Sequence, residues 1–135
     1  FPQLEWKDRK GWHEIPFSEN VVTSDEGRFK RSVSLIKSNQ DLALGGFSLA
    51  WVHEAIKRTR QIGRPGWGRK ITSPTLLLSA CKDQLVDTEK NKQICMSIPN
   101  ISIVEIEGKH ELLMEKDNIR KEVWTEIDKF IERNL

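Results

Sequence analysis

The chain has 135 residues, of which 22 are Lys or Arg and 20 are Asp or Glu, so its formal net charge is only +2. This length suits one domain of ordinary size, and so small a charge gives no support for nucleic-acid binding. No apolar run approaches the roughly 18 residues that a membrane-spanning helix needs, and the opening stretch FPQLEWKDRK has neither the apolar core nor the cleavage site of a signal peptide.

Residues 1–70 predict a helical region, because they hold four of the five tryptophans and no credible strand. Thr23 followed by Glu26 fits a capping box at the start of a first helix. The apolar positions of that helix recur at helical spacing, at Phe29, Val33 and Ile36. A second helix is expected from about Ser48. It would bury Leu49, Val52 and Ile56 on one face, and the turn-rich segment GRPGWGRK (63–70) would follow as a linker.

Residues 71–135 predict an α/β arrangement. SPTLLLSA and ISIVEIEG are short apolar runs typical of buried strands, and each is followed by a helical pattern, DTEKNKQICMSIP and DNIRKEVWTEIDKFIERNL. Trp124 is expected in the core, on the apolar stripe of the last helix. Strand–helix–strand–helix order predicts parallel strands. Because two strands are too few for such a sheet, we expect the C-terminal part of a larger α/β domain.

Two polar side chains are expected at the carboxyl ends of these strands. Asp83 follows the first strand and His110 follows the second. If the strands are neighbours, both side chains rise at one edge, where functional groups of open α/β sheets collect. The carboxylate would then accept a hydrogen bond from one imidazole nitrogen, which leaves the other nitrogen to act as a general base.

Structural alternatives exist for both residues. An Asp after a strand is often a turn or cap residue, and Asp87 is as well placed as Asp83 for that role. A His in a turn is most often solvated or packed. Glu111 and Glu115 are expected to hold the turn around His110.

The segments SPTLLLSACKDQLVD and IPNISIVEIEGKHELLMEKD resemble the last third of bacterial lysophospholipases, α/β-hydrolases close to the monoacylglycerol lipases. The resemblance implies that Asp83 is the acid and His110 the base of a catalytic triad. Upstream, NVVTSDEGRFKR and LALGGFSLAWVHEA resemble the helical cap of those enzymes. The expected fold is therefore the C-terminal portion of an α/β-hydrolase (71–135), preceded by a helical cap region (1–70).

The resemblance implies a carboxylic ester hydrolase that acts on lysophospholipid or monoacylglycerol, with a serine on a G-x-S-x-G turn before the cap. This chain has no such turn. GFSLA (46–50) comes nearest, but Ser48 lacks a convincing strand before it and is expected to be a helix N-cap. We therefore expect a fragment that lacks the nucleophile and is inactive alone. The alternative is a non-catalytic α/β module that binds lipid or assembles with a partner.

Partners and location follow from other features. The cluster of six basic residues in 57–70 could contact an anionic membrane, or it could be a solvated helix end; its members are Lys57, Arg58, Arg60, Arg64, Arg69 and Lys70. No His-Glu pair extends to H-E-x-x-H, so neither metal nor cofactor is expected. Cys81 and Cys95 are expected to be buried thiols, compatible with the cytoplasm. Truncation would leave an unpaired strand edge, which predicts self-association.

Overall fold

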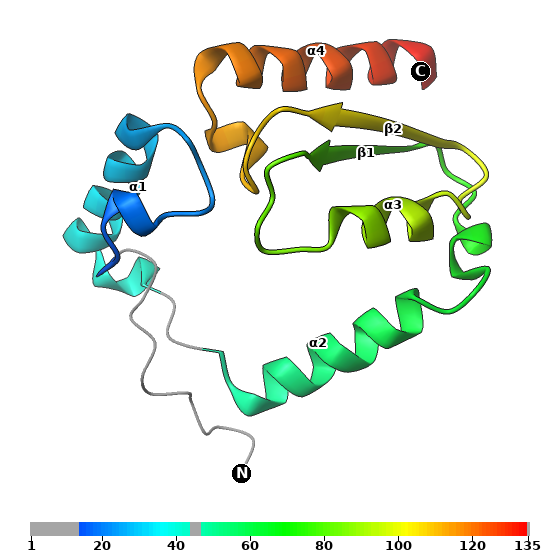
Figure 1. The fold of residues 1–135 in the computed structure, drawn as a ribbon, viewed down its shortest axis with the longest axis horizontal. Coiled ribbons are helices and arrows are strands. Elements are labelled where there is room, and N and C mark those ends of the chain that lie inside the picture. Colours follow the sequence, from blue (N-terminus) through cyan, green and yellow to red (C-terminus); the bar gives the residue numbers. More distant parts are fainter. Residues whose placement is uncertain (1–13, 44–46, 135) are drawn as a thin grey trace. The chain divides into compact units, whose positions relative to one another are not determined.

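The computed structural model describes residues 14–43 and 47–134. The described elements alternate as the sequence predicts, two helices followed by strand, helix, strand and helix (Figure 1). The helices and strands are α1 (Glu26–Ser38), α2 (Leu49–Ile62), β1 (Thr75–Ala80), α3 (Thr88–Cys95), β2 (Ile101–Ile106) and α4 (Asp117–Asn134). A short 3-10 turn at Phe17–Glu19 precedes α1, and others lie between the elements at Gln40–Leu42, Trp67–Lys70 and Leu112–Met114.

The chain forms two compact units, which are described separately below. The first contains α1 and α2, and the second contains both strands, α3 and α4. The second unit also includes Val21–Asp25, a short segment that precedes α1. The assignment of residues 1–70 to a cap stays a prediction.

The second unit is built on two parallel strands. β1 pairs with β2 from Thr75 opposite Ile101 to Ala80 opposite Ile106, and α3 forms the crossover between them. Figure 1 shows α3 on one side of the strand pair and α4 on the other. The predicted α/β class is therefore confirmed. The pairing extends past the strands, because the N–H groups of Cys81 and Lys82 donate to the carbonyls of Ile106 and Gly108, both at 2.9 Å.

The core of this unit lies between the strands and α4. Ile106 and Val123 are 0% and 1% exposed. The prediction that Trp124 is a core residue is wrong, because its side chain is 47% exposed. Trp124 lies about 100° around the helix from Val123, and two strands cover only the face that carries Val123. Cys81 is also exposed rather than buried, since it follows β1 in a turn, whereas Cys95 is half-buried.

The first unit packs α1 around Phe29, which is 4% exposed and whose ring centroid lies 5.5 Å from that of Phe17. α1 begins at Glu26, two residues later than a capping box at Thr23 predicts. Instead, the fully buried Thr23 side chain accepts the Asp25 N–H and donates to the Met114 carbonyl.

α2 begins where the sequence predicts. Its N-cap is Ser48, whose hydroxyl oxygen accepts the Trp51 N–H at 3.1 Å. The predicted burial of its apolar face is wrong: Leu49, Val52 and Ile56 are 49%, 37% and 48% exposed.

Candidate active site

Asp83 lies in the turn that follows β1, and its carboxylate is almost fully buried, with 5% of the side chain exposed. One oxygen, Oδ1, accepts the N–H groups of Leu85 at 2.8 Å and Val86 at 3.2 Å. These bonds hold the turn in an Asx-type conformation and fix the direction of the carboxylate. Asp87 has a different role: its side chain accepts the Lys90 N–H at 2.8 Å and caps α3.

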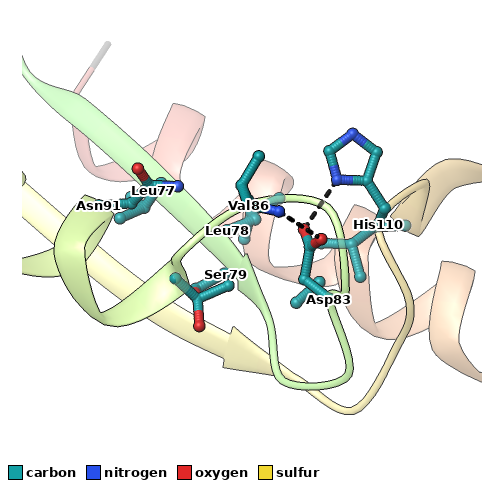
Figure 2. A pocket seen from close by; sticks show the side chains of 10 residues that line it. Leu77, Leu78, Ser79, Asp83, Val86, Asn91 and His110 are labelled. Carbon is teal, nitrogen blue, oxygen red and sulfur yellow. Dashed lines mark hydrogen bonds and ion pairs between the residues drawn. The ribbon is translucent and has the colours of Figure 1, made fainter. Parts of the chain in front are cut away.

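His110 follows β2, and its Nδ1 lies 2.8 Å from Oδ2 of Asp83 (Figure 2). The hydrogen bond from Lys82 N–H to the Gly108 carbonyl brings the two loops together just before these side chains. The structure thus joins the two residues that the sequence selected. The turn-residue alternative for Asp83 also holds, because Oδ1 serves the turn while Oδ2 binds the imidazole.

The environment of Asp83 favours its ionised form. Burial raises the pKa of this carboxyl, but the hydrogen bonds from Leu85 N–H, His110 and Val86 N–H together outweigh burial and leave the pKa below its ordinary value of 3.8. Because an ionised carboxylate can only accept, Nδ1 of His110 carries the proton of this bond. In the neutral ring, Nε2 is then the free acceptor, and 32% of the His110 side chain is exposed.

We predict that Asp83→Asn removes a pH-dependent part of the stability. Because the pKa of Asp83 is lower in the folded state, the ionised carboxylate stabilises the fold fully at pH values above its unfolded-state pKa. This contribution to stability is lost as the pH falls through the folded-state pKa. Urea unfolding of both proteins between pH 7 and pH 3 measures this. The difference in unfolding free energy should shrink below about pH 4, and a difference that stays constant down to pH 3 would contradict the depressed pKa.

A small hollow of about 190 Å³ opens beside the pair. Its walls come from β1 and from the loops and helix that follow, and the lining residues include Leu77, Ser79, Asp83, Val86, Asn91 and His110. Figure 2 shows the Ser79 hydroxyl pointing away from His110. In the described ranges, no serine is hydrogen-bonded to His110.

The glutamates near His110 differ in their roles. Glu115 is fully buried, and its Oε1 accepts the Lys109 N–H at 2.9 Å, so it holds the turn as predicted. The Glu111 side chain is exposed, and Glu111 holds the loop through its backbone: its N–H donates to the Val22 carbonyl and its carbonyl accepts the Met114 N–H, both at 2.8 Å. This contact with Val21–Asp25 was not foreseen from the sequence.

In the part of the chain that the structure describes, no group of three or more His, Cys, Asp or Glu side chains is arranged to hold a metal ion. None of the described helices is long and apolar enough to cross a membrane.

No family model matches the chain. Comparison with curated proteins finds similarity to lysophospholipases. The probable lysophospholipase L2 of Haemophilus influenzae is 31% identical over 113 residues, which cover 83% of this chain and 36% of that protein. Lysophospholipase L2 of Escherichia coli K12 is 30% identical over 132 residues, or 91% of this chain and 38% of that protein. The chain thus spans less than two-fifths of the length of these relatives.

Among solved structures, a soluble variant of monoglyceride lipase from Saccharomyces cerevisiae matches 85% of this chain and 41% of its own, with a TM-score of 0.66 and 14% identity. At that identity the match shows a shared fold. Together these findings confirm the resemblance to bacterial lysophospholipases, and they confirm that the chain has the fold of the C-terminal portion of an α/β-hydrolase.

Proposed function

We propose that this chain supplies the acid and base of a serine hydrolase that cleaves the acyl ester of a lysophospholipid or a monoacylglycerol. The observation that carries the proposal is the 2.8 Å hydrogen bond between Nδ1 of His110 and a buried, ionised Asp83 at the carboxyl ends of adjacent parallel strands. The similarity to lysophospholipases supplies the class of substrate.

In this proposal, Nε2 of His110 takes the proton of a serine hydroxyl as the serine oxygen attacks the ester carbonyl. Asp83 stabilises the imidazolium that forms. The tetrahedral intermediate then expels the glycerol-containing alcohol, which receives the proton from Nε2–H, and an acyl-serine remains. Water attacks the acyl-serine with His110 again as the base, and the products are the fatty acid and the free serine.

We propose that the nucleophile lies outside this chain. The best-placed serine by sequence, Ser48, uses its hydroxyl to cap α2, a role that explains its presence without chemistry. Intact mass after treatment of the chain with a fluorophosphonate tests this, with Ser48→Ala and His110→Ala variants alongside. No adduct is expected. A single adduct that is lost in both variants would make Ser48 the nucleophile and overturn this part of the proposal.

The alternative function is a non-catalytic module that binds lipid or a partner, which the lack of a serine bonded to His110 in the described residues favours. Assays of the gene product that contains this chain distinguish the hydrolase from the non-catalytic module. Ester hydrolysis that depends on His110 supports the hydrolase. Lipid binding without hydrolysis and without fluorophosphonate labelling supports the alternative. We propose that the protein is cytoplasmic and in peripheral contact with the inner membrane.

The membrane contact is proposed for α2 and the basic segment 57–70. At about 100° per residue, the exposed apolar side chains of α2 share one side of the helix; they are Leu49, Trp51, Val52, Ile56 and Ile62. Arg58 and Arg60 fall at the two edges of this apolar side. A helix of this pattern, with an aromatic apolar face bordered by cations, lies in the interface of an anionic bilayer.

We therefore predict that the chain binds vesicles containing phosphatidylglycerol more tightly than pure phosphatidylcholine vesicles. Reversing Arg58 and Arg60 to Glu should weaken binding at least about tenfold, given about 1 kcal/mol per basic residue at such a surface. Lys121 and Lys129 on α4 provide a matched control for the same change in net charge. Vesicle co-sedimentation is the measurement, and equal binding by the two double variants would contradict a role for α2.

We also propose that the chain self-associates through the free edge of β1. The strand pair is the whole described sheet, in the order β1–β2, and the N–H groups of Thr75 and Cys81 point to β2. Because strand N–H groups alternate, those of Leu76, Leu78 and Ala80 face the other edge. An unpaired edge of this kind invites pairing between chains.

Light scattering should therefore give a mass above the monomer mass of 15.7 kDa. Leu78→Pro removes one donor from the free edge and no donor from the β1–β2 ladder, so it should shift the mass toward that of the monomer. Circular dichroism checks that the variant is folded. A monomeric wild-type chain at high concentration would contradict the proposal.

A further inference from the structure

The segment Val21–Asp25, here named the strap, is hydrogen-bonded to the loop that carries His110. The carbonyl of Val22 accepts the Glu111 N–H at 2.8 Å. The hydroxyl of Thr23 donates to the Met114 carbonyl at 2.7 Å, and the Ser24 N–H donates to Oε1 of Glu115 at 3.0 Å. Thr23 and Glu115 are both 0% exposed. The strap is therefore a buried support for this loop, although it lies about ninety residues away in sequence.

Glu115 connects the strap directly to the residue before His110. Its Oε1 accepts the Ser24 N–H and also the Lys109 N–H at 2.9 Å. On the other side of His110, the Glu111 N–H is held by the strap at Val22. The backbone is thus fixed immediately before and immediately after the imidazole-bearing residue.

Close packing leaves this part of the loop little room to move. A Cβ added at Gly108 would lie 2.7 Å from Cδ2 of Leu112 and 3.3 Å from Cγ of Glu115, so the loop passes directly over the Glu115 stem. The Gly108 carbonyl accepts the Lys82 N–H, one residue before Asp83. Glu115 therefore supports the place where the two site loops meet.

We infer that Glu115, together with Thr23 of the strap, is a positioning residue that holds His110 in hydrogen-bonding register with Asp83. Glu115 binds the Lys109 N–H before His110 directly, and it also binds Ser24 of the strap, whose Val22 carbonyl holds the Glu111 N–H after His110. Loss of the Glu115 acceptor leaves two N–H groups without this bond in a buried place, and their desolvation favours a rearranged loop. A small displacement of His110 is enough to break a directional bond to Asp83. The inference rests on the proposed function for the importance of that bond and on observed contacts for its geometry.

Three glutamate variants of this chain test the inference. In Glu115→Gln, the side-chain carbonyl oxygen can still accept both bonds, whereas Glu115→Leu keeps a similar size and accepts none. Glu107→Leu is the control, because Glu107 lies on the same loop with 71% of its side chain exposed, paired to Lys82. The readout is the tautomer of the neutral His110 ring, measured from its two nitrogen chemical shifts by NMR. A ring held by Asp83 carries its proton on Nδ1, whereas a free imidazole prefers Nε2.

We expect Glu115→Leu to lower the ratio of the Nδ1–H form to the Nε2–H form by at least about threefold, while Glu115→Gln and Glu107→Leu keep the wild-type ratio. If Glu115→Leu does not fold, Thr23→Val removes the hydroxyl donor at nearly constant shape and should lower the ratio, and Thr23→Ser should keep it. A folded Glu115→Leu or Thr23→Val protein with the wild-type ratio would overturn the inference. The readout needs no serine and no substrate, so its outcome is independent of whether the natural protein hydrolyses esters.

Discussion

Replacing Asp83 by Asn is expected to reduce kcat for ester hydrolysis by about 10³–10⁴-fold in the gene product that contains this chain and its nucleophile. The variant keeps the size of the side chain, and its carbonyl oxygen can still serve the turn N–H groups of Leu85 and Val86. It loses the negative charge that faces Nδ1 of His110 at 2.8 Å. The imidazole then lacks the partner that fixes its tautomer and stabilises its charged form, so Nε2 is a poor base.

Asp87→Asn is the matched control for this substitution. Asp87 lies four residues further on and caps α3 by accepting the Lys90 N–H, and Asn caps helices about as well as Asp. Its activity should remain at the wild-type level. His110→Ala should lose more activity than Asp83→Asn, because the imidazole is the base itself, and the double variant should be little worse than His110→Ala alone, because the two residues act as a unit. Activity of Asp83→Asn within tenfold of wild type would contradict the proposed pair.

The Asp83–His110 contact could be predicted because each residue follows a strand that its local sequence indicates. Two apolar runs of strand length, joined by one helix, favour adjacent parallel strands, and each polar residue then follows a strand end by a few positions. The capping roles of Ser48 and Asp87 were predictable for the same reason, since an N-cap bond spans only three residues.

Features that depend on distant parts of the chain were not predictable. The strap meets Met114 and Glu115 across 91 residues of sequence, and no periodicity connects such segments. The capping-box pattern at Thr23 predicted a helix start that the structure does not have, because the Thr23 hydroxyl accepts the Asp25 N–H and donates to the distant Met114 carbonyl, and α1 begins at Glu26. The predictions of burial at Trp124 and along α2 were also wrong. An apolar stripe shows which face of a helix can be buried, but it does not show whether another part of the protein packs against that face.

Ile106→Ala is expected to lower the free energy of unfolding by about 2–5 kcal/mol, the range for a buried aliphatic residue cut back to Ala. Ile106 is 0% exposed and ends β2. Its carbonyl accepts the N–H groups of Cys81 at 2.9 Å and Gly108 at 2.7 Å, so its side chain anchors the backbone from which both site loops depart. A cavity there should loosen the support of Asp83 and His110 as well as the sheet.

Ile131→Ala provides the control, because the same atoms are removed from a side chain of α4 that is 44% exposed. This substitution should lower the free energy of unfolding by about 1 kcal/mol or less, since the Ile131 side chain buries little apolar surface on folding. Urea unfolding, followed by circular dichroism at fixed chain concentration, measures both variants. Fixed concentration matters because self-association would add to the apparent stability. Equal shifts in the two midpoints would mean that Ile106 is not part of a packed core, and the sheet would then be too weakly held to position the proposed catalytic pair by itself.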